Sequence, residues 1–139
     1  RALAALDTAA RALAARDHSE ASLRRRLSDR GARPRDIDGA VGVLARAGLL
    51  DDERAAAERA RALAVRGYGD EAIRADLAAR GFGVPAIEAA LSLLEPEIAR
   101  VAGLVERHGA SAKTLGMLGR RGFAAEPLAD LADRIAGEA

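Results

Sequence analysis

The chain repeats itself, and this repetition limits what it can fold into. Residues 18–44 align without a gap to residues 68–94, about 50 positions later. The identical pairs are Arg24/Arg74, Leu27/Leu77, Arg30/Arg80, Gly31/Gly81, Ile37/Ile87, Ala40/Ala90 and Leu44/Leu94. A fainter third copy follows, in which Leu118, Arg121, Gly122 and Phe123 take the corresponding places. Repeats of about 40–50 residues are typical of helical arrays, in which each unit packs on its neighbours.

The composition agrees with an all-α fold. Half of the 139 residues are apolar, only 2% are aromatic and none is cysteine. The apolar residues are mostly alanine and leucine, which favour helices, whereas the residue types that favour strands are scarce. Without cysteine the chain has no disulfide, thiolate nucleophile or cysteine-ligated metal. No apolar run reaches the roughly 18 residues of a membrane span, and the first residues lack the apolar stretch of a signal peptide, so we expect a soluble cytoplasmic protein.

Start and stop signals divide the chain into three units of three helices, at residues 1–50, 51–94 and 95–139. In the first unit, helices are expected from Ala2 to Arg16, from Ser19 to Arg30, and from Pro34 to the residue before Gly48. Ser19 is placed to cap the second helix, and proline is tolerated in a first turn. Gly31 and Gly48 stand where left-handed residues end helices, with Leu49 available for the apolar contact of such a cap.

Apolar spacing predicts which side chains form the cores. The residues expected to point inward in the first unit are Leu3, Leu6, Ala10 and Leu13, then Leu23 and Leu27, then Ile37, Ala40, Val41 and Leu44. Phe82 and Phe123 each follow the glycine that ends a second helix. Their recurrence at one repeat position predicts packing between the second and third helices of a unit.

No set of residues with the pattern of a catalytic site is found. His18 and His108 lie far apart, and neither has a second histidine at helical ligand spacing. The run Asp51-Asp52-Glu53 fits the start of a helix better than a metal site, because anionic side chains stabilise the positive end of a helix. Gly67-Tyr68-Gly69 matches part of a dinucleotide fingerprint, but no strand precedes it. We therefore expect no enzyme and no cofactor.

The basic residues carry more information. Of the 22 basic residues, 21 are arginine, and only Lys113 is lysine. The candidate contact residues for a partner or DNA are Arg24, Arg25, Arg26, Arg30, Arg33, Arg35, Arg74, Arg80, Lys113, Arg120 and Arg121. Such a surface suits phosphates or an acidic protein groove. The arginines also fit a solvated face with local ion pairs. Heavy use of alanine and arginine can also reflect the codon composition of the gene, so both explanations stay open.

The motifs resemble those of the RecX regulatory proteins. The segment 18–27 and the following Arg30-Gly31 are similar to the signature of their first repeat. Gly48-Leu49-Leu50-Asp51-Asp52 resembles the segment that joins their first and second repeats, and it is the most specific piece. Gly67-Tyr68-Gly69 with Arg80-Gly81-Phe82 resembles the second repeat, and Arg120-Arg121-Gly122-Phe123 the third. Two departures are Ala55 and Ala56 in place of an aromatic residue, and Ala72 in place of a basic one.

The resemblance implies three tandem three-helix repeats in an elongated, curved array. It also implies a modulator of the RecA recombinase in DNA repair, DNA recombination and the SOS response. Family members bind within the helical groove of the RecA–DNA filament, block its growth and inhibit its ATPase, strand-exchange and coprotease activities. Many also bind single- or double-stranded DNA directly, and we expect a monomer.

Two further functions fit the same pattern. Three-helix units with a basic second helix also resemble helix-turn-helix modules, which bind DNA. A helical scaffold for some other protein is the third possibility.

Overall fold

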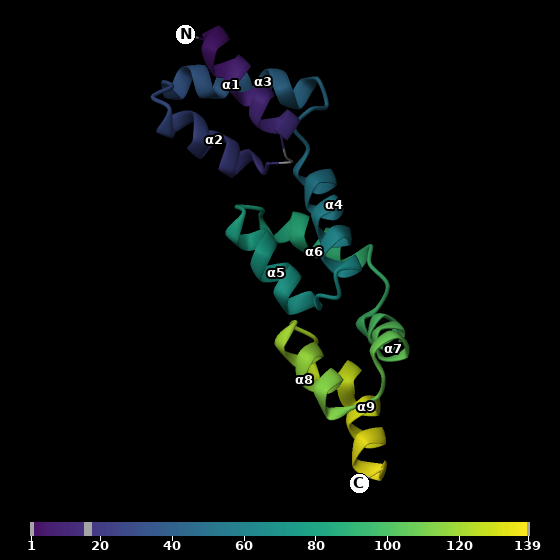
Figure 1. Cartoon of the computed structure of the whole chain (residues 1–139). Helices are drawn as coiled ribbons and strands as arrows, with labels where there is room; N and C mark the ends of the chain where they lie inside the picture. The colour runs from purple at the N-terminus through teal and green to yellow at the C-terminus, as the bar shows by residue number, and fades with distance from the viewer. Residues whose placement is uncertain (1, 16–17, 139) are drawn as a thin grey trace.

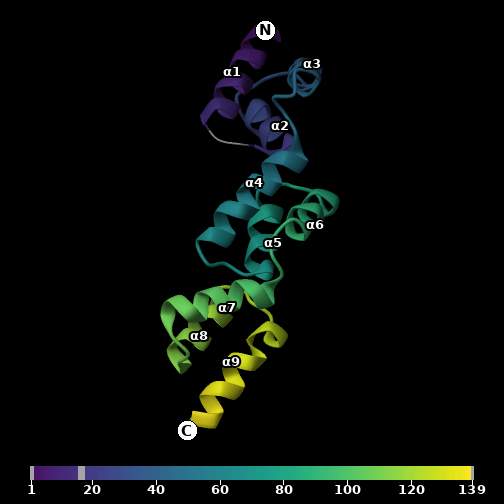
Figure 2. The same ribbon diagram turned by 90° about the vertical axis from the view of Figure 1, so that its right-hand side faces the viewer.

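The computed structural model is a row of helices with its two ends far apart (Figures 1 and 2). It describes residues 2–15 and 18–138, and within these ranges all regular secondary structure is helical. The helices are α1 (Ala2–Ala15), α2 (Glu20–Asp29), α3 (Pro34–Arg46), α4 (Asp52–Val65), α5 (Asp70–Ala79), α6 (Val84–Ser92), α7 (Glu97–His108), α8 (Ala112–Arg120) and α9 (Ala125–Glu138). The predicted all-α class is therefore confirmed. None of these helices combines the length and the apolar character needed to cross a bilayer.

The helices form three groups, each around its own set of buried side chains. The buried residues of α1–α3 include Leu23, Leu27, Ile37, Val41 and Leu44. Those of α4–α6 include Ala56, Leu63, Ile73, Leu77 and Phe82, and those of α7–α9 include Val101, Leu104, Leu118, Phe123 and Leu131. The boundaries that we predicted at residues 50 and 94 lie between these sets. We keep them as our division of the chain into units 1, 2 and 3.

The predicted inner face of α1 is right for Leu6, which is half-buried against the core of unit 1, but wrong for Leu3 and Ala10. Ala5 and Ala9 are buried, whereas Leu3 is 81% exposed and Ala10 is exposed. The small alanines let α1 lie close along α3, and this contact outweighs the preference for burying the larger leucine. The side chain of Leu13 and the predicted end of the helix at Arg16 fall outside the described residues.

Glycine ends the second helix of each unit, as the sequence predicted. Gly31, Gly81 and Gly122 have φ angles of 85°, 89° and 87°, in the left-handed region that glycine adopts without strain. In unit 1 the N–H of Ala32 donates to the carbonyl of Leu27 at 3.0 Å. This bond pairs one of the last carbonyls of α2, which have no partner inside the helix.

The second helices of the three units, α2, α5 and α8, follow one another head to tail (Figure 1). Ser19 caps α2 as predicted, and its hydroxyl also donates to the carbonyl of Arg80 at the end of α5, at 2.6 Å. One unit further along, the N–H of Gly69 donates to the carbonyl of Arg121 at 2.7 Å. Between α5 and α8 the unpaired N–H groups of one helix thus meet the unpaired carbonyls of the other directly, and between α2 and α5 the Ser19 hydroxyl makes the connection. The helix dipoles align in both cases.

The contact between units 2 and 3 leaves no room for a side chain. A Cβ atom at Gly69 would lie 2.5 Å from the carbonyl carbon of Gly122. A Cβ atom at Gly122 would lie 2.5 Å from the backbone nitrogen of Ala72. Glycine is needed at both positions because the two backbones approach each other directly.

A carboxylate strengthens each contact between units. Asp52, the first residue of α4, accepts the N–H of Glu20 at 2.8 Å. Glu97, the first residue of α7, accepts the N–H of Asp70 at 2.9 Å. Each acid therefore caps the second helix of the preceding unit. Burial raises the pKa of Asp52, while the hydrogen bond from the Glu20 backbone opposes this shift.

Candidate functional site

A basic groove runs along unit 1, between α1, α2 and the loop that follows α2. Two adjoining hollows of about 410 Å³ and 150 Å³ share Thr8 and Arg30 in their walls. Arg26 and Arg33 complete the cationic lining together with Arg11, which pairs with Asp7 at 2.8 Å. We call the surface formed by Thr8 and these four arginines the unit 1 basic groove. Asp36 also lines the larger hollow.

Arg26 and Arg30 lie on the surface because the opposite side of α2 faces the core of unit 1. Leu23 and Leu27 are buried in the core of unit 1, so Arg26 and Arg30 point outward, one helical turn apart. Within the described residues, Arg26, Arg30 and Arg33 form no ion pair. Like charges one turn apart repel each other and slightly destabilise a helix. An anionic partner would remove this repulsion, so the groove has the chemistry of a binding surface for phosphates or carboxylates.

Other predicted contact residues are engaged within the chain. Arg24 pairs with Asp38 at 2.7 Å and with Glu20 at 3.2 Å, and the hydrogen bond to Asp38 raises the pKa of its guanidinium. Its repeat partner Arg74 pairs with Glu88 at 3.0 Å. Both arginines hold a second helix to the third helix of the same unit.

Arg80 belongs to a second ion-pair cluster, on unit 2. Asp76 accepts two hydrogen bonds from Arg59, at 3.1 and 3.0 Å, and a third from Arg80 at 2.9 Å. The bond from Arg59 is the main cause of a lowered pKa of Asp76. This cluster ties α4 to α5.

Replacing Asp76 with asparagine should therefore make stability less dependent on acid. The pKa of Asp76 in the folded chain lies below its ordinary value of 3.8, so the ionised carboxylate stabilises the fold above that pH. This contribution is lost as the pH falls through the lowered pKa. We expect Asp76→Asn to cost about 1–2 kcal/mol at neutral pH. Urea unfolding at pH 7 and near pH 3 should show the difference from wild type shrinking with acid, and an unchanged difference would contradict this assignment.

Arg121 lies at the contact between units 2 and 3. Its guanidinium donates to the carbonyl of Arg66 at 2.9 Å and lies over the ring of Tyr68, 5.6 Å from the centroid. Lys113 and Arg120 are exposed instead, and with His108 they line a hollow of about 320 Å³ on unit 3. Unit 3 thus has a second, smaller cationic surface.

The predicted cations fall into two classes. Seven are exposed and form no ion pair with the described residues: Arg25, Arg26, Arg30, Arg33, Arg35, Lys113 and Arg120. Four are engaged in contacts within or between units: Arg24, Arg74, Arg80 and Arg121. The first class carries the candidate contact surface.

The junction segment from Gly48 to Asp52 is a structural connection. Gly48 ends α3 with a φ angle of 74°, as predicted. We predicted that Leu49 makes the apolar contact of this cap, but Leu49 is 56% exposed. The next residue, Leu50, is 7% exposed and belongs to the core of unit 1. Asp51 accepts a backbone N–H in the first turn of α4 at 3.1 Å, and Asp52 bridges units 1 and 2. The segment therefore fixes unit 2 against unit 1.

Sequence reasoning missed Arg100, which connects units 2 and 3. Its side chain is only 10% exposed and pairs with Asp70 at 2.6 Å. It also donates to the carbonyl of Tyr68 at 2.6 Å and lies over the ring of Phe123, 5.4 Å from the centroid. Periodicity gave no signal for this residue, because its contacts depend on how two units are placed against each other.

The described residues offer no metal site. They contain no group of three histidine, cysteine, aspartate or glutamate side chains that could hold an ion. The ring Nδ1 of His18 lies 2.9 Å from the hydroxyl of Ser22, in the first turn of α2, which fits a structural role.

Two relatives decide the family. The chain is 35% identical over 121 residues to the Regulatory protein RecX of Stenotrophomonas maltophilia, covering 80% of this chain and 74% of that protein. It is 32% identical over 111 residues to the Regulatory protein RecX of Vibrio vulnificus, covering 77% and 72%. The chain belongs to the RecX family. The RecX of Xanthomonas campestris is 40% identical over 83 residues, and here the chain spans about half of the relative's length, 51%.

Solved RecX structures have the same fold. The crystal structure of RecX from Lactobacillus salivarius matches with a TM-score of 0.78, covering 97% of this chain and 96% of that one at 16% identity. A second RecX crystal structure matches with a TM-score of 0.74, covering 95% and 73% at 19% identity. No family model matches the chain. The RecX fold of this chain is thus shared by proteins with little sequence identity to it.

Proposed function

We propose that the chain is a non-enzymatic regulator of the RecA recombinase, acting in the bacterial cytoplasm in DNA repair, recombination and the SOS response. In this proposal it lies in the helical groove of the RecA–DNA filament and stops filament growth. ATP hydrolysis and strand exchange then fall because fewer active protomers assemble.

The observation that carries the proposal is membership of the RecX family, whose members are named regulatory proteins. Two features of the chain support the proposal that it binds in the groove of the RecA filament. Its units are joined end to end, and such an extended shape offers a long surface to another assembly (Figure 2). The unit 1 basic groove provides cations that can pair with phosphates or carboxylates.

A titration of RecA ATP hydrolysis on single-stranded DNA tests this proposal. We expect hydrolysis to fall at less than one chain per RecA protomer, since a chain that blocks a growing end affects many protomers. Full hydrolysis at equimolar chain, together with tight DNA binding by the chain alone, would favour the DNA-binding alternative instead.

The unit 1 basic groove keeps a DNA-binding module as the second candidate. If Arg26, Arg30 and Arg33 contact phosphates, replacing all three with alanine should reduce the slope of log K against log salt by about 2–3. Fluorescence anisotropy with labelled single-stranded DNA at several salt concentrations measures that slope. An unchanged slope would remove DNA phosphates as ligands of this groove.

A further inference from the structure

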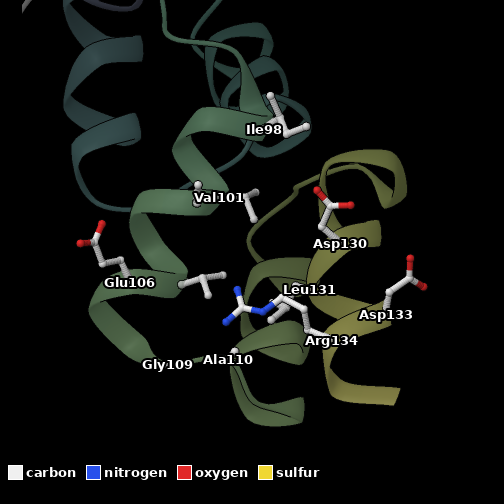
Figure 3. Close-up of a pocket in the computed structure, with 11 residues that line it drawn as sticks. Ile98, Val101, Glu106, Gly109, Ala110, Asp130, Leu131, Asp133 and Arg134 are labelled. Atoms are coloured by element: carbon white, nitrogen blue, oxygen red, sulfur yellow. The ribbon is translucent and has the colours of Figure 1, made fainter. Parts of the chain in front are cut away.

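Unit 3 carries an apolar groove between α7 and α9, on a different unit from the basic groove. It encloses about 800 Å³ (Figure 3). Val101, Val105 and Leu131 form its floor and are at most 8% exposed. Ile98 stands at one edge with 58% of its surface exposed.

The groove exists because α7 is bulkier than its counterpart in unit 2. Asp52 and Glu97 begin α4 and α7 and make the same capping bond, so these two helices can be aligned from their first residues. The alignment places Val101 and Val105 of α7 where α4 has Ala56 and Ala60.

The alanines let α4 pack along α6, whereas α7 and α9 touch over a shorter stretch and diverge (Figure 2). Valine at both positions keeps the third helix further away and leaves a hollow above a buried apolar floor.

Three acidic residues line the groove, Glu106 on α7 and Asp130 and Asp133 on α9. Figure 3 shows Asp130 at the upper end of the groove, whereas the carboxylates of Glu106 and Asp133 project toward the outer sides of the two helices. Arg134 is the one cation among the described lining residues, and its side chain extends from α9 toward α7. None of the three acids forms an ion pair with a described residue. The groove is therefore apolar at its floor and net negative at its rim.

We propose that this groove binds one amphipathic helix of a partner protein, apolar on one face and bearing lysine or arginine at its edges. A helix laid between two diverging helices would cover the exposed Ile98 and lie over the apolar floor with its apolar face. Its basic side chains would pair with Asp130 and Asp133 along the α9 edge of the groove. The negative rim disfavours acidic helices and anionic membranes. This inference does not depend on the proposed regulation of RecA.

Model peptides test the proposal on the whole chain. The probe is a labelled helical peptide of about 14 residues, or four turns, with leucine on one face and lysine on the flanks. A second peptide has glutamate in place of lysine. Fluorescence anisotropy should show that the lysine peptide binds and that the glutamate peptide does not.

Three variants locate the binding. Ile98→Ser removes an exposed side chain, so the fold is kept, and it should weaken binding about fivefold. Asp130→Asn combined with Asp133→Asn should weaken binding and reduce its dependence on salt. Val65→Ser, at a 79% exposed valine on α4, is the matched control and should bind as wild type does.

Three outcomes would overturn the proposal. The first is equal binding of the two peptides, and the second is equal binding by the Ile98→Ser and Val65→Ser variants. The third is a concentration-dependent dimer of the chain that Ile98→Ser abolishes, since a second copy would then be the occupant.

Discussion

Gly122→Ala should destabilise the chain by about 2–5 kcal/mol. Two costs add at this position. A left-handed backbone costs a residue with a Cβ about 1–2 kcal/mol, and the φ angle here is 87°. The new Cβ would also lie 2.5 Å from the backbone nitrogen of Ala72, and such overpacking typically costs about 1–3 kcal/mol. Urea unfolding followed by circular dichroism measures the loss.

Gly31 provides the matched control for this experiment. It occupies the same position in unit 1, with a φ angle of 85°, but a Cβ atom added at Gly31 would have no side chain or backbone within 4 Å apart from its chain neighbours. Gly31→Ala should therefore show only the backbone cost. If the two variants lose equal stability, the close contact between α5 and the end of α8 does not contribute, and our account of how the units are joined is wrong.

The second large effect concerns the unit 1 basic groove. Replacing Arg26, Arg30 and Arg33 with alanine should raise the concentration of chain needed to inhibit RecA ATP hydrolysis by about 10- to 100-fold. Each exposed ion pair that is lost contributes roughly 0.5–1 kcal/mol, and 1.4 kcal/mol corresponds to a factor of ten. Helicity should be unchanged, because these side chains make no ion pair with the described residues.

A control with the same change in net charge separates the groove from general electrostatics. Arg46, Arg61 and Arg107 are exposed on three different units, and replacing all three with alanine should change inhibition little. Equal loss in the two triple variants would mean that net charge, rather than the groove, attracts the filament.

Local signals predicted the elements of the fold well. Ser19, Gly31 and Gly48 act as the caps that their residue types favour, and Pro34 begins α3. Phe82 and Phe123, which we predicted to pack between second and third helices, are buried in the cores of units 2 and 3. These features depend on a few neighbouring residues, so the sequence alone contains them.

The spacing of apolar residues does not predict how closely two helices approach each other. The apolar pattern predicted that Leu3 is buried, but the close approach of α1 to α3 depends on Ala5 and Ala9. Spacing showed that Arg24 and Arg26 lie on α2, but only the position of α3 shows that Arg24 pairs with Asp38 while Arg26 forms no ion pair with a described residue. Both outcomes depend on how helices are placed in space.

The joins between units were missed for the same reason. Arg100 has no counterpart in unit 2, where Ala55 stands at the corresponding position, and Glu97 corresponds to Asp52 only once both are seen to cap a neighbouring unit, yet both hold unit 3 against unit 2. The apolar groove of unit 3 escaped notice because valine in place of alanine looks conservative in sequence. Its consequence is a change in the distance between two helices.

The most direct test of the account is the growth of RecA filaments on single-stranded DNA, followed in real time after nucleation. Adding the chain at well below one copy per RecA protomer should arrest growth, and the variant with Arg26, Arg30 and Arg33 replaced by alanine should need far more. Filaments that reach their full length at the normal rate, with the chain bound only to free DNA, would contradict the proposal that it regulates the filament.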